Sequence, residues 1–113
     1  MAERTVALDK IAVGETRNVS LNFEPMLDDG ELLTGTPTVV EQTTSDLTLT
    51  TKTVSDAALV IDDVDVAAFK AVQYSMSGQL VANSPYTVQV TATTDATPAQ
   101  TLVLWVVARV VDE

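Results

Sequence analysis

The 113-residue chain contains no cysteine and no histidine. Without cysteine it forms no disulfide and offers no thiol chemistry. Nucleophilic triads built on His or Cys are excluded within one chain, and zinc sites usually draw on the same two residue types. Acid–base chemistry is left to carboxylates and tyrosine, and no Gly-rich loop leads into a helix to hold phosphate. These absences predict that the protein is not an enzyme, has no catalytic residues and carries no cofactor.

Basic residues are also scarce, at 6 Lys and Arg against 16 Asp and Glu, so that the net charge is −10. Nucleic-acid binding needs clustered Lys and Arg to neutralise phosphates, and anionic membranes attract the same residues. The six bases are scattered along the chain. The sequence therefore predicts neither a nucleic acid nor a membrane as partner, and the acidity is typical of a soluble β protein that protects its strand edges.

Long apolar runs are missing as well. The longest, Leu102 to Ala108, is far too short for a transmembrane helix, and Met1 to Val6 has no apolar stretch that resembles a secretory signal. We expect synthesis in the cytosol, with export only as part of an assembly. The length predicts a single domain over residues 1–113. Met1 and Asp112-Glu113 favour a whole small protein over an excised repeat.

Threonine and valine are abundant, and together they make up about a third of the chain. Both are β-branched and suit a pleated surface better than a helix. Apolar and polar residues alternate in short runs with turn residues between them. The predicted strands are Thr5–Val13, Arg17–Glu24, Glu31–Glu41, Asp46–Val54, Ala57–Ile61, Val72–Leu80, Tyr86–Thr94 and Thr101–Val111. This pattern predicts an all-β, immunoglobulin-like antiparallel β-sandwich of seven to eight strands.

Two of these strands are expected to be irregular. The apolar pattern of residues 1–13 is interrupted at Asp9-Lys10, which predicts a bend or bulge, or a partly separate N-terminal arm. Pro37 lies in the middle of the Glu31–Glu41 run. Because proline cannot donate to a strand ladder, this run is predicted to lie at a sheet edge or to be broken into two pieces.

Tyr86 follows a proline turn at the start of the penultimate strand. Immunoglobulin-like sandwiches often place a tyrosine there whose hydroxyl bonds back to the preceding corner. The simpler alternative is a tyrosine whose ring packs at the edge of the core while its hydroxyl reaches water.

Carboxylates gather at two places, around Asp62, Asp63 and Asp65 and around Asp28, Asp29 and Glu31. Clustered carboxylates at strand ends can hold Ca²⁺, which takes six to eight oxygen ligands. Neither cluster has the spacing of the helix–loop–helix calcium motif. Asp62, Asp63 and Asp65 are therefore weak calcium candidates, and a solvated acidic turn is the main interpretation.

The last strand, Thr101–Val111, is apolar on both faces. One face carries Leu102, Leu104, Val106, Ala108 and Val110, and the other carries Val103, Trp105, Val107 and Val111 with Arg109 between them. If the first set lines the core, Trp105 points outward, and an exposed patch of that size usually has a partner. Val103, Trp105, Val107 and Arg109 are the candidate protein interface, in a homo-oligomer or against another subunit. The alternative is that Trp105 packs inside the sandwich.

Two segments carry a resemblance to the phage fiber-tail adaptor proteins. The first segment is Arg17–Phe23 followed by Met26–Leu32. It is similar to the family's short strand ending in an aromatic residue, which is followed by Leu-x-x-Gly-Glu and an apolar residue. The second segment, Tyr86–Thr94 followed by Gln100-Thr101-Leu102, resembles the family's closing hairpin. The likeness spans Arg17 to Val111. The chain departs from the family in its doubly apolar last strand and in a longer, more acidic segment over 51–71, so the resemblance assigns no place on the particle.

The resemblance implies a structural protein of a tailed-phage virion, assembled in the host cytoplasm, present in many copies and joining, collaring or decorating other virion subunits. Our first hypothesis is an adaptor or accessory protein of the neck or tail that binds other virion proteins. One alternative is a decoration (cement) protein on the capsid surface. Another is an immunoglobulin-like adhesion or carbohydrate-binding module, which would carry exposed aromatic residues on its loops.

Overall fold

The computed structural model of the chain describes residues 3–42, 46–61, 63–79 and 85–111. Within these ranges nine strands and one short 3₁₀ helix form, which confirms the all-β prediction. They are β1 (Glu3–Ala12), β2 (Arg17–Asn22), η1 (Glu24–Met26), β3 (Leu33–Glu41), β4 (Thr48–Val54), β5 (Leu59–Ile61), β6 (Val64–Val66), β7 (Ala71–Ser77), β8 (Tyr86–Thr94) and β9 (Thr101–Val111). No helix in this described part is long and apolar enough to cross a membrane.

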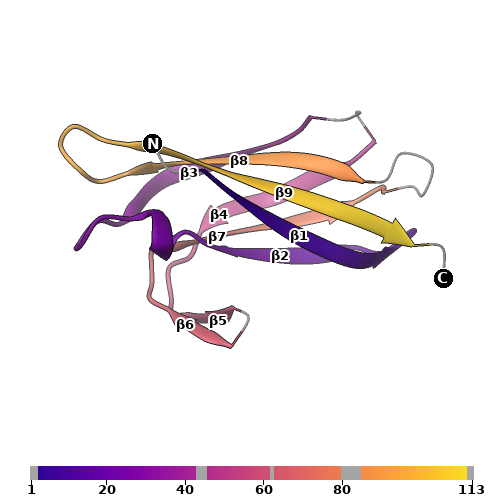
Figure 1. Cartoon of the computed structure of the whole chain (residues 1–113), viewed down its shortest axis with the longest axis horizontal. Helices are drawn as coiled ribbons and strands as arrows, with labels where there is room; N and C mark the ends of the chain where they lie inside the picture. Colours follow the sequence, from indigo (N-terminus) through magenta and orange to yellow (C-terminus); the bar gives the residue numbers. More distant parts are fainter. Residues whose placement is uncertain (1–2, 43–45, 62, 80–84, 112–113) are drawn as a thin grey trace.

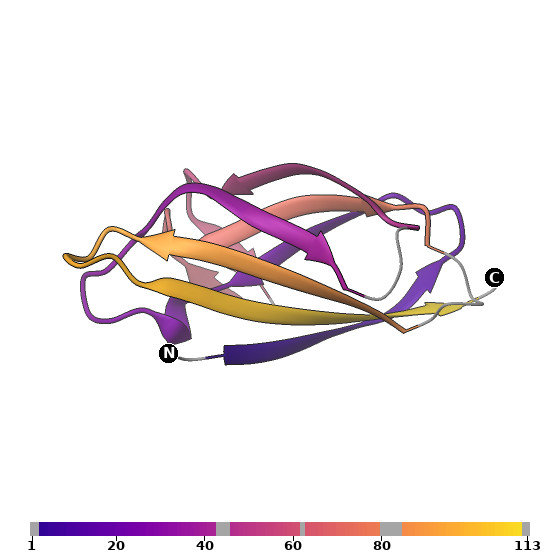
Figure 2. The same cartoon turned by 90° about the horizontal axis from the view of Figure 1, so that it is seen from above.

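The strands form three sheets. Sheet A has the order β1-β9-β8-β3, sheet B the order β2-β7-β4, and β5 and β6 form a separate two-stranded hairpin. Sheets A and B lie face to face in a β-sandwich-like arrangement, and the hairpin projects beyond sheet B (Figure 1). The view turned by 90° shows β3, β8, β9 and β1 side by side (Figure 2).

The structure differs from the sequence-based prediction in two respects. The described chain has nine strands instead of seven or eight, because β6 is a three-residue strand, too short for an alternating pattern to be recognised. The sandwich is also not wholly antiparallel, since β1 runs parallel to β9 along the edge of sheet A. Side chains alternate in the same way in either direction, so the sequence pattern does not report which way two strands pair.

The core lies between the inner faces of the two large sheets, because each strand turns every second side chain inward. Sheet A contributes buried residues from β8 and β9, and sheet B contributes them from β2 and β7. The largest fully buried side chains in the core cluster include Tyr74, Tyr86, Phe23, Ile11, Leu21, Met76, Leu102 and Leu104.

Irregular pairing occurs in three edge strands. In β1 the register with β9 shifts between Leu8 and Ile11, where the sequence predicted a bend. In β3 the register with β8 shifts between Thr34 and Thr38, around Pro37, and β3 is the edge of sheet A as predicted. In β4, at the edge of sheet B, the register with β7 shifts between Thr50 and Thr53.

Tyr86 is fully buried, and its hydroxyl donates a hydrogen bond to Asp46 Oδ2 at 2.9 Å. The hydroxyl thus bonds to the segment that leads into β4. Residues 80–84, where the preceding corner lies, fall outside the described residues, so the bond to that corner stays a prediction.

Candidate protein-interaction surfaces

Strand β9 lies between β1 and β8, so both of its edges are paired. Its side chains separate into two sets. Leu102, Leu104, Val106, Ala108 and Val110 are all buried in the core cluster. Val103, Trp105, Val107 and Arg109 alternate with them and therefore point to the outside of sheet A, where the first three are half-buried and Arg109 is exposed. The structure places Trp105 outside the core between the sheets.

Cross-strand pairing builds an apolar centre around Trp105. Trp105 lies beside Thr5 of β1 and Gln89 of β8, and Gln89 lies beside Val40 of β3, which is 44 % exposed. The neighbouring row on the same face pairs Val107 with Ala7 and Thr87. We call this surface the sheet A outer face: Val103, Trp105, Val107, Val40 and Ala7 at its centre, with threonine and glutamine around them.

Negative charge is distributed unevenly over the molecule. Of the carboxylates whose side chains the structure describes, none lies on the outward surface of sheet A or sheet B. They occupy turns, loops, strand ends and the β5–β6 hairpin: Glu15, Glu24, Asp28, Asp29, Glu31, Glu41, Asp46, Asp56, Asp63, Asp65 and Asp95. The described part of each sheet surface is thus neutral, apart from the cation Arg109 on sheet A.

Of the β5–β6 hairpin, the sequence predicted only the first strand, as Ala57–Ile61. Leu59–Ile61 is apolar and Val64–Val66 alternates valine with Asp65. Two residues separate these segments in the sequence, and that spacing is typical of a hairpin. Val66 is fully buried, whereas Val60 is 69 % exposed and Val64 is 48 % exposed. A hollow of about 390 Å³ lies at the base of the hairpin, with Glu24 on its border.

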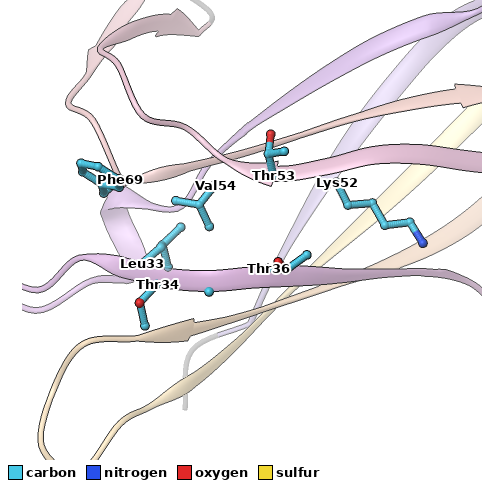
Figure 3. A pocket seen from close by; sticks show the side chains of 8 residues that line it. Leu33, Thr34, Thr36, Lys52, Thr53, Val54 and Phe69 are labelled. Atoms are coloured by element: carbon cyan, nitrogen blue, oxygen red, sulfur yellow. The ribbon is translucent and has the colours of Figure 1, made fainter.

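A slot of about 310 Å³ opens between β3 and β4, where the irregular parts of the two edge strands face each other. Figure 3 shows Leu33 and Val54 pointing toward one another across it, with Phe69 at one end and Lys52 at the other. Threonines 34, 36 and 53 add hydroxyl groups. The lining is therefore mixed, with apolar side chains from Leu33, Val54 and Phe69 and polar ones from Lys52 and the threonines.

The bulge in β4 explains why Lys52 borders this slot. Thr51 and Lys52 both lie opposite the single residue Tyr74 of β7, and Thr51 has a φ of 54°, unusual for a β-branched residue. Tyr74 is 2 % exposed, and its hydroxyl has no hydrogen-bond partner among the described residues. Burial raises the pKa of Tyr74 well above its ordinary value.

The outward surface of sheet B is polar and uncharged. Gln73 Nε2 donates to Ser20 Oγ at 3.2 Å, and Ser75 Oγ donates to Asn18 Oδ1 at 2.7 Å. These bonds link β7 to β2 across the surface and satisfy part of its polar groups internally. This surface lacks the apolar centre of the sheet A outer face.

Two of the three predicted calcium candidates lie among the described residues. Asp62 lies outside the described residues, and Asp63 and Asp65 are exposed at the hairpin. Over the described ranges no group of three or more Asp, Glu, His or Cys side chains is arranged to hold a metal ion. Calcium binding by Asp62, Asp63 and Asp65 stays an untested prediction.

The second acidic cluster, Asp28, Asp29 and Glu31, takes part in hydrogen bonds that stabilise the loop between β2 and β3. Glu31 is 5 % exposed, and its Oε1 accepts a hydrogen bond from the backbone N–H of Asp28 at 2.9 Å. Asp28 Oδ2 accepts one from Gln100 Nε2, and Asp95 Oδ1 accepts one from the N–H of Leu32, both at 2.9 Å. These bonds tie the loop between β2 and β3 to the turn between β8 and β9.

Comparison with known proteins leaves the chain without an assigned family: no family model, no curated protein and no solved structure matches it.

Proposed function

We propose that the protein is a structural subunit of a tailed-phage particle, an adaptor or accessory protein of the neck or tail with an immunoglobulin-like topology. It acts by binding other virion subunits through the sheet A outer face. It performs no reaction and works as one of many copies arrayed by the symmetry of the particle.

The strand orders support the immunoglobulin-like part of the proposal. Immunoglobulin-like sandwiches place their second, fifth and fourth strands in one sheet and their third, sixth and seventh in the other. With the β5–β6 hairpin counted as an insertion, β2-β7-β4 and β3-β8-β9 correspond to these two sets. The first strand departs from the constant-type arrangement, because β1 joins β9 instead of β2.

The observation that carries the binding proposal is the row Val103, Trp105 and Val107 on an outward surface of a strongly acidic protein. Interfaces between subunits typically combine an apolar centre, often with an aromatic residue, and a polar rim. The sheet A outer face has this composition. None of the described side chains on this face is a carboxylate, so a chain of net charge −10 meets less like-charge repulsion there when it approaches another acidic subunit.

The proposal is tested by introducing Trp105→Ser into particles that contain the protein. Loss of the protein from purified particles, with the thermal stability of the isolated variant unchanged, supports binding through this face. Thr50→Ser, on the outward surface of sheet B, is the matched control. Normal incorporation of Trp105→Ser refutes the proposed interface.

Electron microscopy of particles carrying a labelled copy separates the related functions. Label at the neck or tail supports the adaptor proposal, whereas label over the shell supports a decoration protein. Absence from particles together with binding to a glycan array supports the adhesion or carbohydrate-binding alternative and overturns the virion proposal.

A further inference from the structure

The sequence contains one Asp-Gly pair, Asp29-Gly30, in the loop between β2 and β3. At such a pair the backbone nitrogen of the glycine can attack the side-chain carboxyl of the aspartate, because glycine has no Cβ to shield that nitrogen. The five-membered ring that forms reopens with water, and one of the two ways of opening moves the main chain onto the side-chain carbon. Asp29-Gly30 can therefore isomerise to isoaspartate, provided that the fold leaves both groups free.

The structure leaves both reacting groups free. Asp29 and Gly30 are exposed, and no described residue forms a hydrogen bond or an ion pair with the Asp29 carboxylate. The N–H of Gly30 also has no hydrogen-bond partner in the described part of the chain. Both residues line a hollow of about 340 Å³, together with Asp95 and Ala96 of the turn between β8 and β9. Water and a rearranging Asp29 side chain thus have room at this loop.

The residues on either side of this pair are held by hydrogen bonds. The Glu31 N–H donates to the carbonyl oxygen of Asp28 at 2.9 Å, which closes a four-residue turn with Asp29 and Gly30 at its centre. Gly30 has a φ of +80°, the value that the third position of a type II turn requires. The carboxylates of Asp28 and Glu31 each accept a hydrogen bond, whereas the Asp29 carboxylate accepts none from the described residues.

We propose that Asp29-Gly30 isomerises spontaneously in the folded protein and that the change loosens the loop between β2 and β3. In the first step the Gly30 nitrogen bonds to Cγ of Asp29, and the carboxyl OH leaves with the Gly30 amide hydrogen as water. In the second step water adds to the backbone carbonyl carbon of Asp29 and breaks its bond to the Gly30 nitrogen, so that the main chain runs through Cγ. One water is released and one is consumed, so the mass is unchanged. The inference goes beyond the proposed function and does not depend on it.

Isomerisation lengthens the main chain of the turn by one carbon atom. The bond from the Glu31 N–H to the Asp28 carbonyl and the bond from the Asp28 N–H to Glu31 Oε1 both span the altered position. The same two ends of the turn lead to the bonds that reach the turn between β8 and β9, namely Gln100 Nε2 to Asp28 Oδ2 and the Leu32 N–H to Asp95 Oδ1. We expect the isomerised form to hold these bonds less well and therefore to melt below the unmodified protein.

The experiment incubates the folded wild-type protein for weeks in mildly acidic buffer, well below its Tm, and follows isoaspartate by mass spectrometry. Trypsin releases residues 18–52 as one peptide, and fragmentation of that peptide separates isoaspartate at Asp29 from isoaspartate at Asp46. Asp56 is the internal control, because it is exposed, has no partner among the described residues and is followed by Ala57. Isoaspartate is expected to form at least about tenfold faster at Asp29 than at Asp56, since only Asp29 is followed by glycine.

Gly30→Ala is the matched variant. No atom lies within 4 Å of the new Cβ, so we expect the variant to fold, with a modest loss of stability from its positive φ. The rate of isoaspartate formation at Asp29 is expected to fall to the rate at Asp56. If the variant does not fold, the comparison of Asp29 with Asp56 within the wild-type protein decides the question alone.

A second sample, unfolded in urea, separates the chemistry of the pair from the effect of the fold. Isoaspartate at Asp29 in the unfolded chain but not in the folded protein overturns the proposal, because the fold then protects the bond. Equal rates at Asp29 and Asp56 in the folded protein overturn it as well. A purified isomerised fraction that melts at the wild-type temperature refutes the loosening of the loop. None of these results bears on the sheet A outer face, which Trp105→Ser tests separately.

Discussion

Two buried tyrosines with different hydroxyl environments give a matched test of the packing. The Tyr86 hydroxyl donates to a carboxylate at 2.9 Å, whereas the Tyr74 hydroxyl is buried with no partner among the described residues. A hydrogen bond to a charged group contributes about 1.5–3 kcal/mol, so we expect Tyr86→Phe to lower the free energy of unfolding by that amount. Burying an uncompensated hydroxyl costs about 1–3 kcal/mol, so Tyr74→Phe is expected to leave stability unchanged or to raise it.

The assay is thermal and urea unfolding at pH 7, followed by circular dichroism. For a domain of this size 1 kcal/mol corresponds to about 4 °C in Tm, so Tyr86→Phe is expected to melt at least about 6 °C below the wild type. Tyr74→Phe is expected to melt at or above the wild-type temperature. Equal destabilisation by the two substitutions would contradict the assigned hydrogen-bond environments.

The buried Tyr74 hydroxyl also affects how stability depends on pH in the alkaline range. Burial raises the pKa of Tyr74, so above pH ~10 the unfolded chain loses this proton while the folded chain retains it. The contribution of Tyr74 to stability is fully present below the unfolded pKa and falls as the pH rises above it. Tyr74→Phe is therefore expected to lose less stability than the wild type between pH 9 and about 11. An equal loss in the two proteins would refute the burial argument.

Two further predictions concern local structure. Gly78→Ala is expected to lower the free energy of unfolding by about 2–5 kcal/mol, because Gly78 has a φ of +86° and the new Cβ would lie 2.6 Å from the carbonyl oxygen of Asp46. Gly14→Ala is the control, since Gly14 has a φ of +82° but no atom within 4 Å of the new Cβ. It is expected to lower the free energy of unfolding by only about 1–2 kcal/mol. Equal costs would argue against the close approach at Gly78. Hydrogen bonds from the Arg17 side chain and from the backbone N–H of Ala12 hold the pKa of Glu15 below its ordinary value. The stability that this carboxylate contributes is therefore present above pH ~4.3 and is lost as the pH falls through the lowered pKa. Glu15→Gln is therefore expected to lower Tm at pH 7 but not at pH 2, and a difference that persists in acid would contradict this assignment.

Strands with one dry and one wet face could be predicted closely from the sequence. The predicted range Tyr86–Thr94 is the observed β8, and the predicted run Arg17–Glu24 contains β2 (Arg17–Asn22). Burial of alternate residues leaves a period of two in the sequence, and proline marks an edge strand because it lacks an N–H, as Pro37 does in β3.

Features that depend on partners distant in the sequence could not be predicted. The parallel pairing of β1 with β9 joins the two ends of the chain and leaves no local pattern. In β9 both faces are apolar, so only the position of sheet B decides that Leu104 points inward and Trp105 outward. Strand β6, its pairing with β5 and the β3–β4 slot were missed for a related reason, since an isolated three-residue strand and facing bulges give no periodic signal.

The most direct test of the central claim is a cryo-electron microscopy map of particles that contain the protein, at a resolution that shows side chains. We expect density from a neighbouring subunit packed over Val103, Trp105 and Val107. A protein bound in the particle through other surfaces, with Trp105 facing solvent, would contradict it.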